Sequence, residues 1–270
     1  KEISEINIFF KVGDLYLSPC QGRYAMSNTD PAYDPEDLTD WTPPAPPSWT
    51  VLQGRTCRLE PMDPDCHAAG LYAAFSAEPD EAQQWYFLPY GPFTTEKGFI
   101  QWLQTYGTSD GRMFFAIIDQ STDQPVGQAS FQNVVSRNGT VEIGNVRFSA
   151  AMQRSIVATE AIFLMMRHAF DSGYRRLEWK THAGNTRSRR AAHRFGLSWE
   201  GRFRSHMVSR GRSRDTVWFA CTDRDWQALE PAFVTWLAPE NFDNDGNQRS
   251  SLGELTRPVL VALDPDQTSV

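Results

Sequence analysis

The chain is 270 residues long, enough for one large domain or two small ones, and a core of that size can be stable without disulfides or metal ions. Its 33 acidic residues outnumber the 26 lysines and arginines, and the net charge of −7 disfavours a nucleic-acid-binding protein, which would usually be basic. No segment approaches the roughly 18 apolar residues of a membrane span. The four cysteines lack the spacing of a zinc site or a CxxC redox motif, so we expect a cytoplasmic protein that binds neither a membrane nor a metal.

Composition divides the chain into three parts. Residues 1–50 are expected to be an extension, because residues 29–47 are rich in Pro and Asp and end in a proline run that cannot form regular ladders. Residues 51–222 are expected to form the folded domain, and residues 223–270 a C-terminal helix with an acidic tail. Half of all Lys and Arg fall between Arg167 and Arg214. A basic zone of this kind fits a small polyanionic ligand, although a solvated face would have the same composition.

The first half of the expected domain combines two helices with strands. Asp63 suits the N-cap of a helix that runs to about residue 77, and Thr94 or Thr95 caps a second helix that ends at Tyr106. The expected strands are 56–60, 113–119, 125–134 and 141–148, with a turn at 121–124 and a hairpin turn at Asn138-Gly139.

The second half begins with a helix over 159–172, because apolar residues recur there at helical spacing and Gly173 can end it. The elements expected after it are a strand over 176–182, a short helix over 188–195 closed by Gly196, antiparallel strands over 197–204 and 215–221, and a helix from its cap Asp223 to about 237. This order predicts a mixed α/β (α+β) fold.

Three segments gather the residues that are able to hold a ligand. They are the strand Val141–Phe148, the turn Gln153–Glu160 that enters the long helix, and Asn185–Ser188 at the start of the short helix. A strand–turn–helix unit presents free backbone N–H groups and the positive end of a helix dipole, which suit a pyrophosphate. Arg154 adds a cation there. An ordinary capped helix would show the same pattern, so this turn alone does not identify an anion site.

The order and spacing of these segments resemble the GNAT superfamily, most closely the branch of ribosomal-protein-alanine N-acetyltransferases. The motif residues that carry the resemblance are Gln153, Ile156 and Ala158 at the helix entry; Asn185, Ser188 and Gly196 in the second signature; Glu200-Gly201 and Arg210–Asp215 in the closing strands; and Tyr90–Phe93 and Trp226 elsewhere. Any one of these motifs is weak, whereas their joint order is specific. The resemblance covers about residues 50–252 of the chain.

The resemblance implies a GNAT fold, in which a twisted, mostly antiparallel sheet is flanked by helices and its splayed central strands admit acetyl-CoA as co-substrate. It implies an N-acetyltransferase that moves the acetyl group to a primary amine, either a small molecule or a peptide N-terminus, by direct attack. A homodimer is compatible with it. The residues that it assigns to acetyl-CoA are Val146, Arg147, Phe148, Gln153, Arg154, Ser155, Ile156, Val157, Ala158, Thr159, Asn185 and Ser188. Those that it assigns to the acceptor are Trp85, Tyr86, Tyr90 and Glu142.

Glu142 is the candidate general base for this reaction. It alternates with Ile143 along the strand, so its carboxylate can point away from the core and accept the proton that an ammonium must lose before it attacks. A solvated carboxylate or an ion pair is the alternative interpretation. None of the cysteines lies in the motif segments, which argues against a covalent enzyme intermediate.

Basic side chains near the motifs are weaker candidates. His182 and His206 are considered as pocket residues because imidazole titrates near neutrality, while His193 is expected at the surface. The run Arg187, Arg189 and Arg190 is considered for the adenosine phosphates, with a solvated face as the alternative.

Two residues depart from the family pattern. Ile156 stands where the family usually has Gly, and a branched side chain would crowd a turn with positive φ. Ala192 stands where a catalytic Tyr is frequent. These departures leave open a second function, a CoA-binding regulatory module with little catalysis. A third function, nucleic-acid binding through the Arg-rich zone, is disfavoured by the acidic composition.

Overall fold

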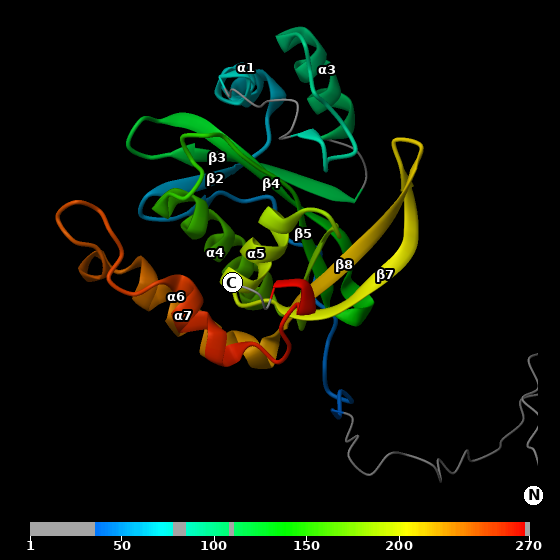
Figure 1. The fold of residues 1–270 in the computed structure, drawn as a ribbon, viewed down its shortest axis with the longest axis vertical. Helices are drawn as coiled ribbons and strands as arrows, with labels where there is room; N and C mark the ends of the chain where they lie inside the picture. The colour runs from blue at the N-terminus through cyan, green and yellow to red at the C-terminus, as the bar shows by residue number, and fades with distance from the viewer. Residues whose placement is uncertain (1–35, 78–84, 108–110, 268–270) are drawn as a thin grey trace, which may run out of the picture. The chain divides into compact units, whose positions relative to one another are not determined.

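The computed structural model describes residues 36–77, 85–107 and 111–267. The chain divides after Trp41, and residues 42–270 form one compact unit. In this unit eight strands form a single sheet in the order β1-β2-β3-β4-β5-β6-β8-β7 (Figure 1). The strands are β1 Leu52–Gln53, β2 Cys57–Pro61, β3 Arg112–Asp119, β4 Gln124–Val135, β5 Thr140–Phe148, β6 Arg176–His182, β7 Ser198–Ser209 and β8 Arg212–Thr222.

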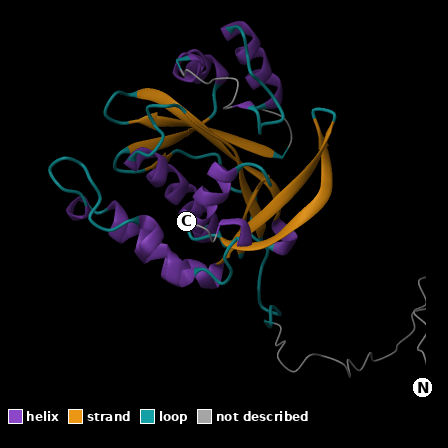
Figure 2. Cartoon of the chain, in the orientation of Figure 1, coloured by secondary structure: helices purple, strands orange, loops and turns teal. Residues whose placement is uncertain are grey.

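Helices cover both faces of the sheet, as Figures 1 and 2 show. Helices α1 (Pro64–Ser76) and α3 (Glu96–Tyr106) lie over one face, and α4 (Ile156–Asp171), α5 (Thr186–Arg194), α6 (Asp223–Leu237) and the short α7 (Leu252–Thr256) lie on the other. Every neighbouring pair of strands is antiparallel except β5 and β6. The predicted α/β fold with a mostly antiparallel sheet is therefore confirmed.

Strand β3 has an apolar side chain on both faces of the sheet because both faces are covered. Its alternate residues Phe114, Ala116 and Ile118 pack in a cluster with α1 and α3. The intervening residues belong to the larger core on the side of α4. Successive side chains of a strand point to opposite faces, so a strand between two helical layers has a continuous apolar sequence.

Local capping explains where the helices begin. The carboxylate of Asp63 accepts from the N–H of Asp65, and the Thr95 hydroxyl accepts from the N–H of Gly98, as the sequence predicted. The long helix α4 begins at Ile156, three residues before the expected start, because Ser155 caps it. The last helix is capped by Thr222 rather than by Asp223.

The hairpin of β7 and β8 is longer than the expected pair of strands. Its register shifts between Phe203 and Met207, where Ser205 takes a φ of 52°. The irregularity interrupts the apolar alternation, which is why the sequence pattern stops near residue 204 although the strand continues to Ser209.

Of the expected extension, residues 1–35 lie outside the described residues. The proline run at 43–47 has no regular structure, as its composition predicts. It lies against the connection between α4 and β6, where the hydroxyl of Tyr174 donates to the carbonyl of Ala45 at 3.0 Å.

A buried carboxylate ties α4 to the turn between β1 and β2. Glu160 is 5% exposed, and its oxygens accept from the backbone N–H groups of Arg55 (2.8 Å), Thr56 (2.6 Å) and Cys57 (2.9 Å). Burial acts to raise the pKa of Glu160, but these hydrogen bonds together with the Thr56 hydroxyl outweigh it and hold the pKa below its ordinary value. The ionised carboxylate therefore stabilises the fold.

We expect Glu160→Gln to lower the free energy of unfolding at pH 7 by about 2–3 kcal/mol, because the amide is neutral and brings a donor to a site built for an acceptor. The folded-state pKa is depressed, so this contribution is present above the unfolded pKa and is lost as pH falls through the folded value. Denaturant unfolding at pH 7 and at pH 3–4 measures it. Glu96→Gln, at an exposed position of α3, serves as the control. An equal effect of both substitutions would contradict the prediction.

Candidate active site

The two central strands separate in the middle of the sheet. Strands β5 and β6 pair at only three positions, from Thr140↔Arg176 to Glu142↔Glu178. Beyond Glu142, β5 stays paired with β4 as far as Phe148, and β6 stays paired with β8 as far as His182. The edge of β5 that faces β6 therefore carries backbone groups without a ladder partner, and a cleft of about 1140 Å³ opens beside it.

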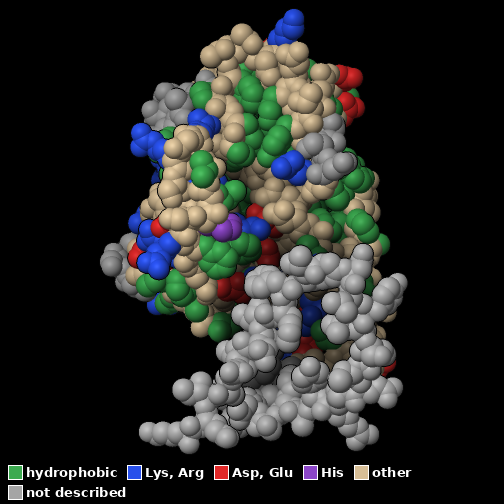
Figure 3. Space-filling model, turned by 90° about the vertical axis from the view of Figure 1, so that its right-hand side faces the viewer, with side chains coloured by type: hydrophobic (Ala, Val, Ile, Leu, Met, Phe, Trp, Pro, Cys, Tyr) green, Lys and Arg blue, Asp and Glu red, His purple; other side chains and the backbone are tan. Residues whose placement is uncertain are grey.

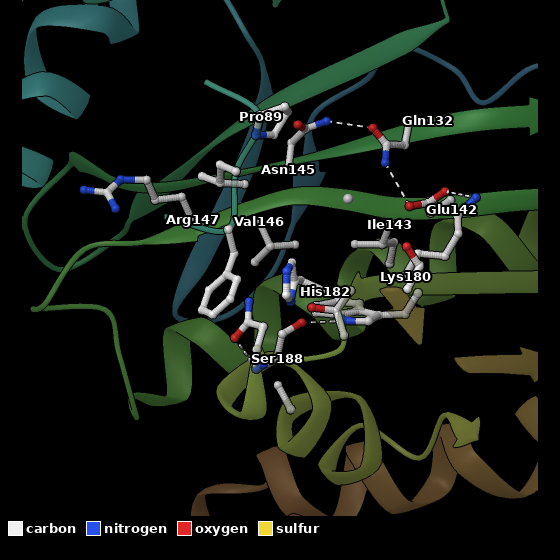
Figure 4. A pocket seen from close by; sticks show the side chains of 18 of the residues that line it. Pro89, Gln132, Glu142, Ile143, Asn145, Val146, Arg147, Lys180, His182 and Ser188 are labelled. Carbon is white, nitrogen blue, oxygen red and sulfur yellow. Dashed lines mark hydrogen bonds and ion pairs between the residues drawn. The ribbon is translucent and has the colours of Figure 1, made fainter. Parts of the chain in front are cut away.

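The cleft passes through the sheet. Four consecutive residues of β6, from Trp179 to His182, all line it, and so does β5 from Glu142 to Phe148. Neighbouring side chains of a strand point to opposite faces, so a cavity lined by every one of them reaches both faces. We call the part of the cleft lined by the start of α5, with Ser188, the first mouth. We call the part lined by Glu142 and Lys180 the second mouth (Figure 4).

The start of α5 lines the first mouth. Asn185 caps the helix, since its Oδ1 accepts from the N–H of Ser188 at 3.1 Å. The hydroxyl of Ser188 accepts in turn from Trp179 Nε1 at 2.9 Å. Both predicted acetyl-CoA residues therefore lie in the cleft and also have structural bonds, while Arg187 is exposed beside them.

The turn before α4 takes a different course from the expected one. The residue with positive φ is Arg154 (60°), whereas Ile156 is the first helical residue and packs partly against the core. The expected crowding at Ile156 therefore does not arise. Gln153 lines the cleft and donates from Nε2 to the carbonyl of Phe148 at 3.3 Å. Arg154 is exposed next to it.

The remaining predicted residues of the turn do not line the cleft. Ser155 is the cap of α4, and Val157 packs partly against the core. Ala158 and Thr159 are buried, and the Thr159 hydroxyl accepts from Arg194 Nη1 at 3.0 Å. What this turn offers a ligand is its first helical N–H groups, which by helix geometry have no carbonyl partner inside the helix.

Val146, Arg147 and Phe148 all line the cleft, but the side chain of Arg147 points away from its centre (Figure 4). Its guanidinium lies over the rings of Phe75 (4.3 Å) and Trp85 (3.9 Å). Arg147 therefore contributes its backbone to the cleft and its side chain to packing.

Glu142 lies at the second mouth in a buried polar network, not in solvent. The residue is 3% exposed. Its carboxylate accepts from Gln132 Nε2 at 2.9 Å and from Asn133 Nδ2 at 2.6 Å, and it pairs with Lys180 Nζ at 2.6 Å. Of the two alternatives for this carboxylate, the structure has the ion pair, and Figure 4 shows the network that holds it.

Neighbouring residues make this network sterically possible. A Cβ on Gly144 would lie 2.2 Å from Gln132 Nε2, so the glycine leaves the space through which that side chain reaches Glu142. Asn145, with a φ of 52° at the strand irregularity, donates to Gln132 Oε1 at 2.8 Å. The amide of Gln132 is thereby fixed with its NH₂ group toward the carboxylate.

The two histidines considered as pocket residues both line the second mouth. His182 Nδ1 accepts from the backbone N–H of Gly184 at 2.9 Å, and a backbone N–H can only donate. Burial lowers the pKa of His182, and the charge of Arg214 lowers it further. The neutral ring therefore carries its proton on Nε2 and offers a donor rather than a base. Figure 3 shows one face of the molecule, on which a histidine lies among basic, acidic and apolar side chains.

The other basic residues of α5 turn away from the cleft. Arg189 is buried and pairs with Asp264 and Asp266 near the C-terminus, and Arg190 donates to Gln267 at 3.2 Å. His193 is half-buried, not at the surface, and its Nε2 accepts from the N–H of Asp264 at 2.8 Å. Burial lowers the pKa of His193. Of the run of arginines, only Arg187 lines the cleft.

The aromatic residues predicted at the acceptor do not line the cleft. Trp85 and Tyr90 are buried in the cluster under α1 and α3, and Tyr86 is exposed. The residues between them, Phe87–Pro89, line it instead. Arg210 at the tip of the β7–β8 hairpin positions this loop, because its Nη2 lies 2.9–3.3 Å from the carbonyl oxygens of Trp85, Leu88, Tyr90 and Gly91.

Several residues of the second mouth escaped the sequence analysis: Gln132, Asn133, Lys180, Arg214 and Thr216. A weak signal existed, since Lys180 alternates with the apolar Trp179 in a predicted strand. Its pairing with Glu142 depends on the parallel register of β5 and β6, which the sequence does not contain.

Among the described residues, no group of His, Cys, Asp or Glu is placed to hold a metal ion. No helix in the described part of the chain is both long and apolar enough to cross a membrane.

Comparisons with known proteins agree with this geometry. A GCN5-related N-acetyltransferase from Brucella melitensis has a TM-score of 0.79 and 42% identity, covering 82% of this chain and 100% of that one. A probable acetyltransferase of the GNAT family from Chromobacterium violaceum has a TM-score of 0.68 and 35% identity, covering 74% and 100%. The uncharacterized N-acetyltransferase p20 of Bacillus licheniformis is 23% identical over 172 residues, 63% of this chain and 96% of its own.

The acetyltransferase (GNAT) domain family matches residues 57–198, which include β2 to β6, α4, α5 and most of the cleft. The fold, the separated central strands and these matches together show that the chain belongs to the GNAT family of acetyltransferases.

Proposed function

We propose that this acetyltransferase transfers the acetyl group of acetyl-CoA to a primary amine by direct attack, and that Glu142 receives the proton that the amine loses. The observation that carries the proposal is the cleft that passes through the sheet. Two reactants that enter by opposite mouths can meet between β5 and β6 without either having to leave before the other binds.

The residues at the first mouth fit acetyl-CoA. The unpaired edge of β5 offers backbone donors and acceptors to the amides of the pantetheine arm, in the manner of an added strand. The first N–H groups of α4, with Arg154 exposed beside them, suit the pyrophosphate. Acetyl-CoA supplies the acyl group as a thioester. A backbone N–H of Val146–Phe148 would polarise the carbonyl of that thioester.

At the second mouth the acceptor nitrogen needs a proton acceptor. As the nitrogen bonds to the acyl carbon it gives up a proton, and the carbon–sulfur bond breaks so that the sulfur leaves with the electron pair. Support for Glu142 comes from its place as a lining carboxylate and from His182, whose Nδ1 is already engaged by Gly184. Lys180 Nζ lies 2.6 Å from the carboxylate and holds it in place beside the cleft.

The CoA-binding regulatory module remains the second candidate. In the sequence, Ile156 and Ala192 suggested this module because they depart from the family pattern. In the structure, neither residue favours the module strongly. Ile156 lies in the helix and does not crowd the turn. Ala192 is fully buried in the core, and its neighbour Ala191 lines the cleft. A side chain that protonates the leaving sulfur is still lacking at α5, so turnover has to be measured.

The acceptor is expected to be a small amine or a peptide N-terminus. A cytoplasmic location stays our expectation, supported by the free thiols of Cys57, Cys66 and Cys221. A homodimer also stays a prediction.

We expect millimolar acetyl-CoA to raise the melting temperature, because a ligand that binds only the native state stabilises it by mass action. Arg154→Glu should reduce this shift, since it places a negative charge at the proposed pyrophosphate site. Arg137→Glu, the same change at an exposed position of the β4–β5 connection, should not. Thermal melts and release of free thiol with a panel of amines test both steps. Absence of any shift with acetyl-CoA would refute the proposed function, and a shift without thiol release would favour the regulatory module.

We expect Glu142→Gln to lower kcat by about 10²–10⁴-fold at neutral pH while acetyl-CoA still binds, because general base catalysis contributes about that much. Raising the pH should restore part of the loss, since more of the acceptor arrives as free amine. Glu200→Gln is the matched control: it removes an exposed carboxylate on β7 that does not line the cleft. Steady-state rates from pH 6 to 10 measure the effect. A Glu142→Gln enzyme that works at full rate would exclude Glu142 as the base.

A further inference from the structure

The second mouth of the cleft contains more positive charge than its one carboxylate balances. Among the described residues that line the whole cleft, Glu142 is the single acid, and it pairs with Lys180. Glu178, outside the lining, lies 3.7 Å from Lys180 and is itself paired with Arg176 at 2.9 Å. The basic residues that line it are Arg112, Arg147, Lys180, Arg187 and Arg214. Arg187 lies at the first mouth with the start of α5, and Arg147 stacks on aromatic rings. The guanidinium of Arg112 lies over the ring of Tyr106, 4.3 Å from its centre. At the second mouth Arg214 therefore needs an explanation.

Strand pairing places Arg214 on the same face of the sheet as the candidate base. His182 pairs with Thr216 and Lys180 with Trp218, so the alternate residues of β8 continue the row that Lys180 and His182 form on β6. Arg214 is the next residue of that row after Thr216. Like His182 and Glu142, it lines the cleft.

The guanidinium of Arg214 is half-buried and has no ion pair or hydrogen bond with any residue that the structure describes. Its Nε is fully buried without a partner. The next residue, Asp215, faces the other way and accepts from Arg202 at 2.8 Å. A desolvated donor without an acceptor costs free energy, so a fold that keeps one beside a substrate cleft has a use for it there.

We propose that Arg214 binds a carboxylate of the acceptor, and hence that the acceptor is an amine that also carries a carboxylate group. This inference rests on the proposed function. A guanidinium presents parallel N–H donors that match the two oxygens of a carboxylate. The charge of Lys180 is compensated by Glu142, so Arg214 is the cation that can bind the acceptor's carboxylate. The amine of the acceptor then faces Glu142. The negative charge of Glu142 and the positive charge of Arg214 thus orient a zwitterionic acceptor.

The experiment measures binding of matched pairs, each an amino acid and its carboxamide, by calorimetry. The pairs are L-alanine, L-phenylalanine, β-alanine and 4-aminobutyrate with their amides, so that the spacing between amine and carboxylate varies. Each is titrated into the protein alone and into the protein saturated with CoA, which prevents transfer. In at least one pair we expect the carboxylate to bind roughly 10-fold or more tightly than the amide, as one charge-assisted contact would give.

Arg214→Gln should abolish that preference without changing the affinity for CoA. Arg214→Lys should keep part of it, and Arg212→Gln, which removes an exposed charge two residues away on the same strand, should keep all of it. Amides that bind as tightly as the acids in every pair, or a preference that survives Arg214→Gln, would overturn the inference. A failure of the proposed function is seen separately, as absence of CoA binding in the same titrations.

Discussion

The site depends on one constraint, which is that β5 and β6 stop pairing after Glu142. Backbone groups in the middle of a sheet are normally all bonded, because an unpaired buried N–H or C=O is costly. Here the edge of β5 is left open over a stretch where its other edge remains paired with β4. In this stretch Asn145 of β5 takes a positive φ, and the side chain of Trp179 on β6 donates to Ser188 of α5. A ligand with its own amides can complete this edge, which is why the open edge is proposed as the place of the pantetheine arm.

The two mouths differ in how their polar groups are held. At the first mouth the side chain of Asn185 caps α5, and Ser188 accepts a single bond from Trp179 of β6. At the second mouth Glu142 is bonded from three different positions on β4 and β6. A buried ion pair is weak evidence for stability, since apolar residues of the same size would often stabilise as well. Its presence beside the opening is better explained by chemistry: the pair fixes the carboxylate at the place where the proposed reaction needs a proton acceptor.

Sequence reasoning succeeded where the cause is local. The caps Asp63 and Thr95, the strand Arg176–His182 and the short helix before Gly196 all depend on residues within a few positions of one another. It misplaced the start of α4 because Ile156–Ala158 had been assigned to a loop motif, although Ser155 is a good cap. It missed Lys180 and Arg214 because their roles depend on pairing between strands that are distant in the chain. It chose Trp85 and Tyr90 rather than Phe87–Pro89 because the course of that loop is determined by Arg210.

The difference between the site residues that the sequence predicted and those that it missed has a physical origin, which bears on function. The side proposed for acetyl-CoA is built from a strand, a turn and two helix starts that follow one another in the chain, so its pattern can be recognised in the sequence and indicates the family. The side proposed for the acceptor is assembled from β4, β6, the loop at 85–91 and the β7–β8 hairpin, which meet only in the folded protein. A change of one residue on the hairpin can alter the acceptor without disturbing the helix entry. Members of one family can therefore share a donor site and differ in acceptor, and the acceptor of this chain has to be read from residues such as Arg214 rather than from the family motif.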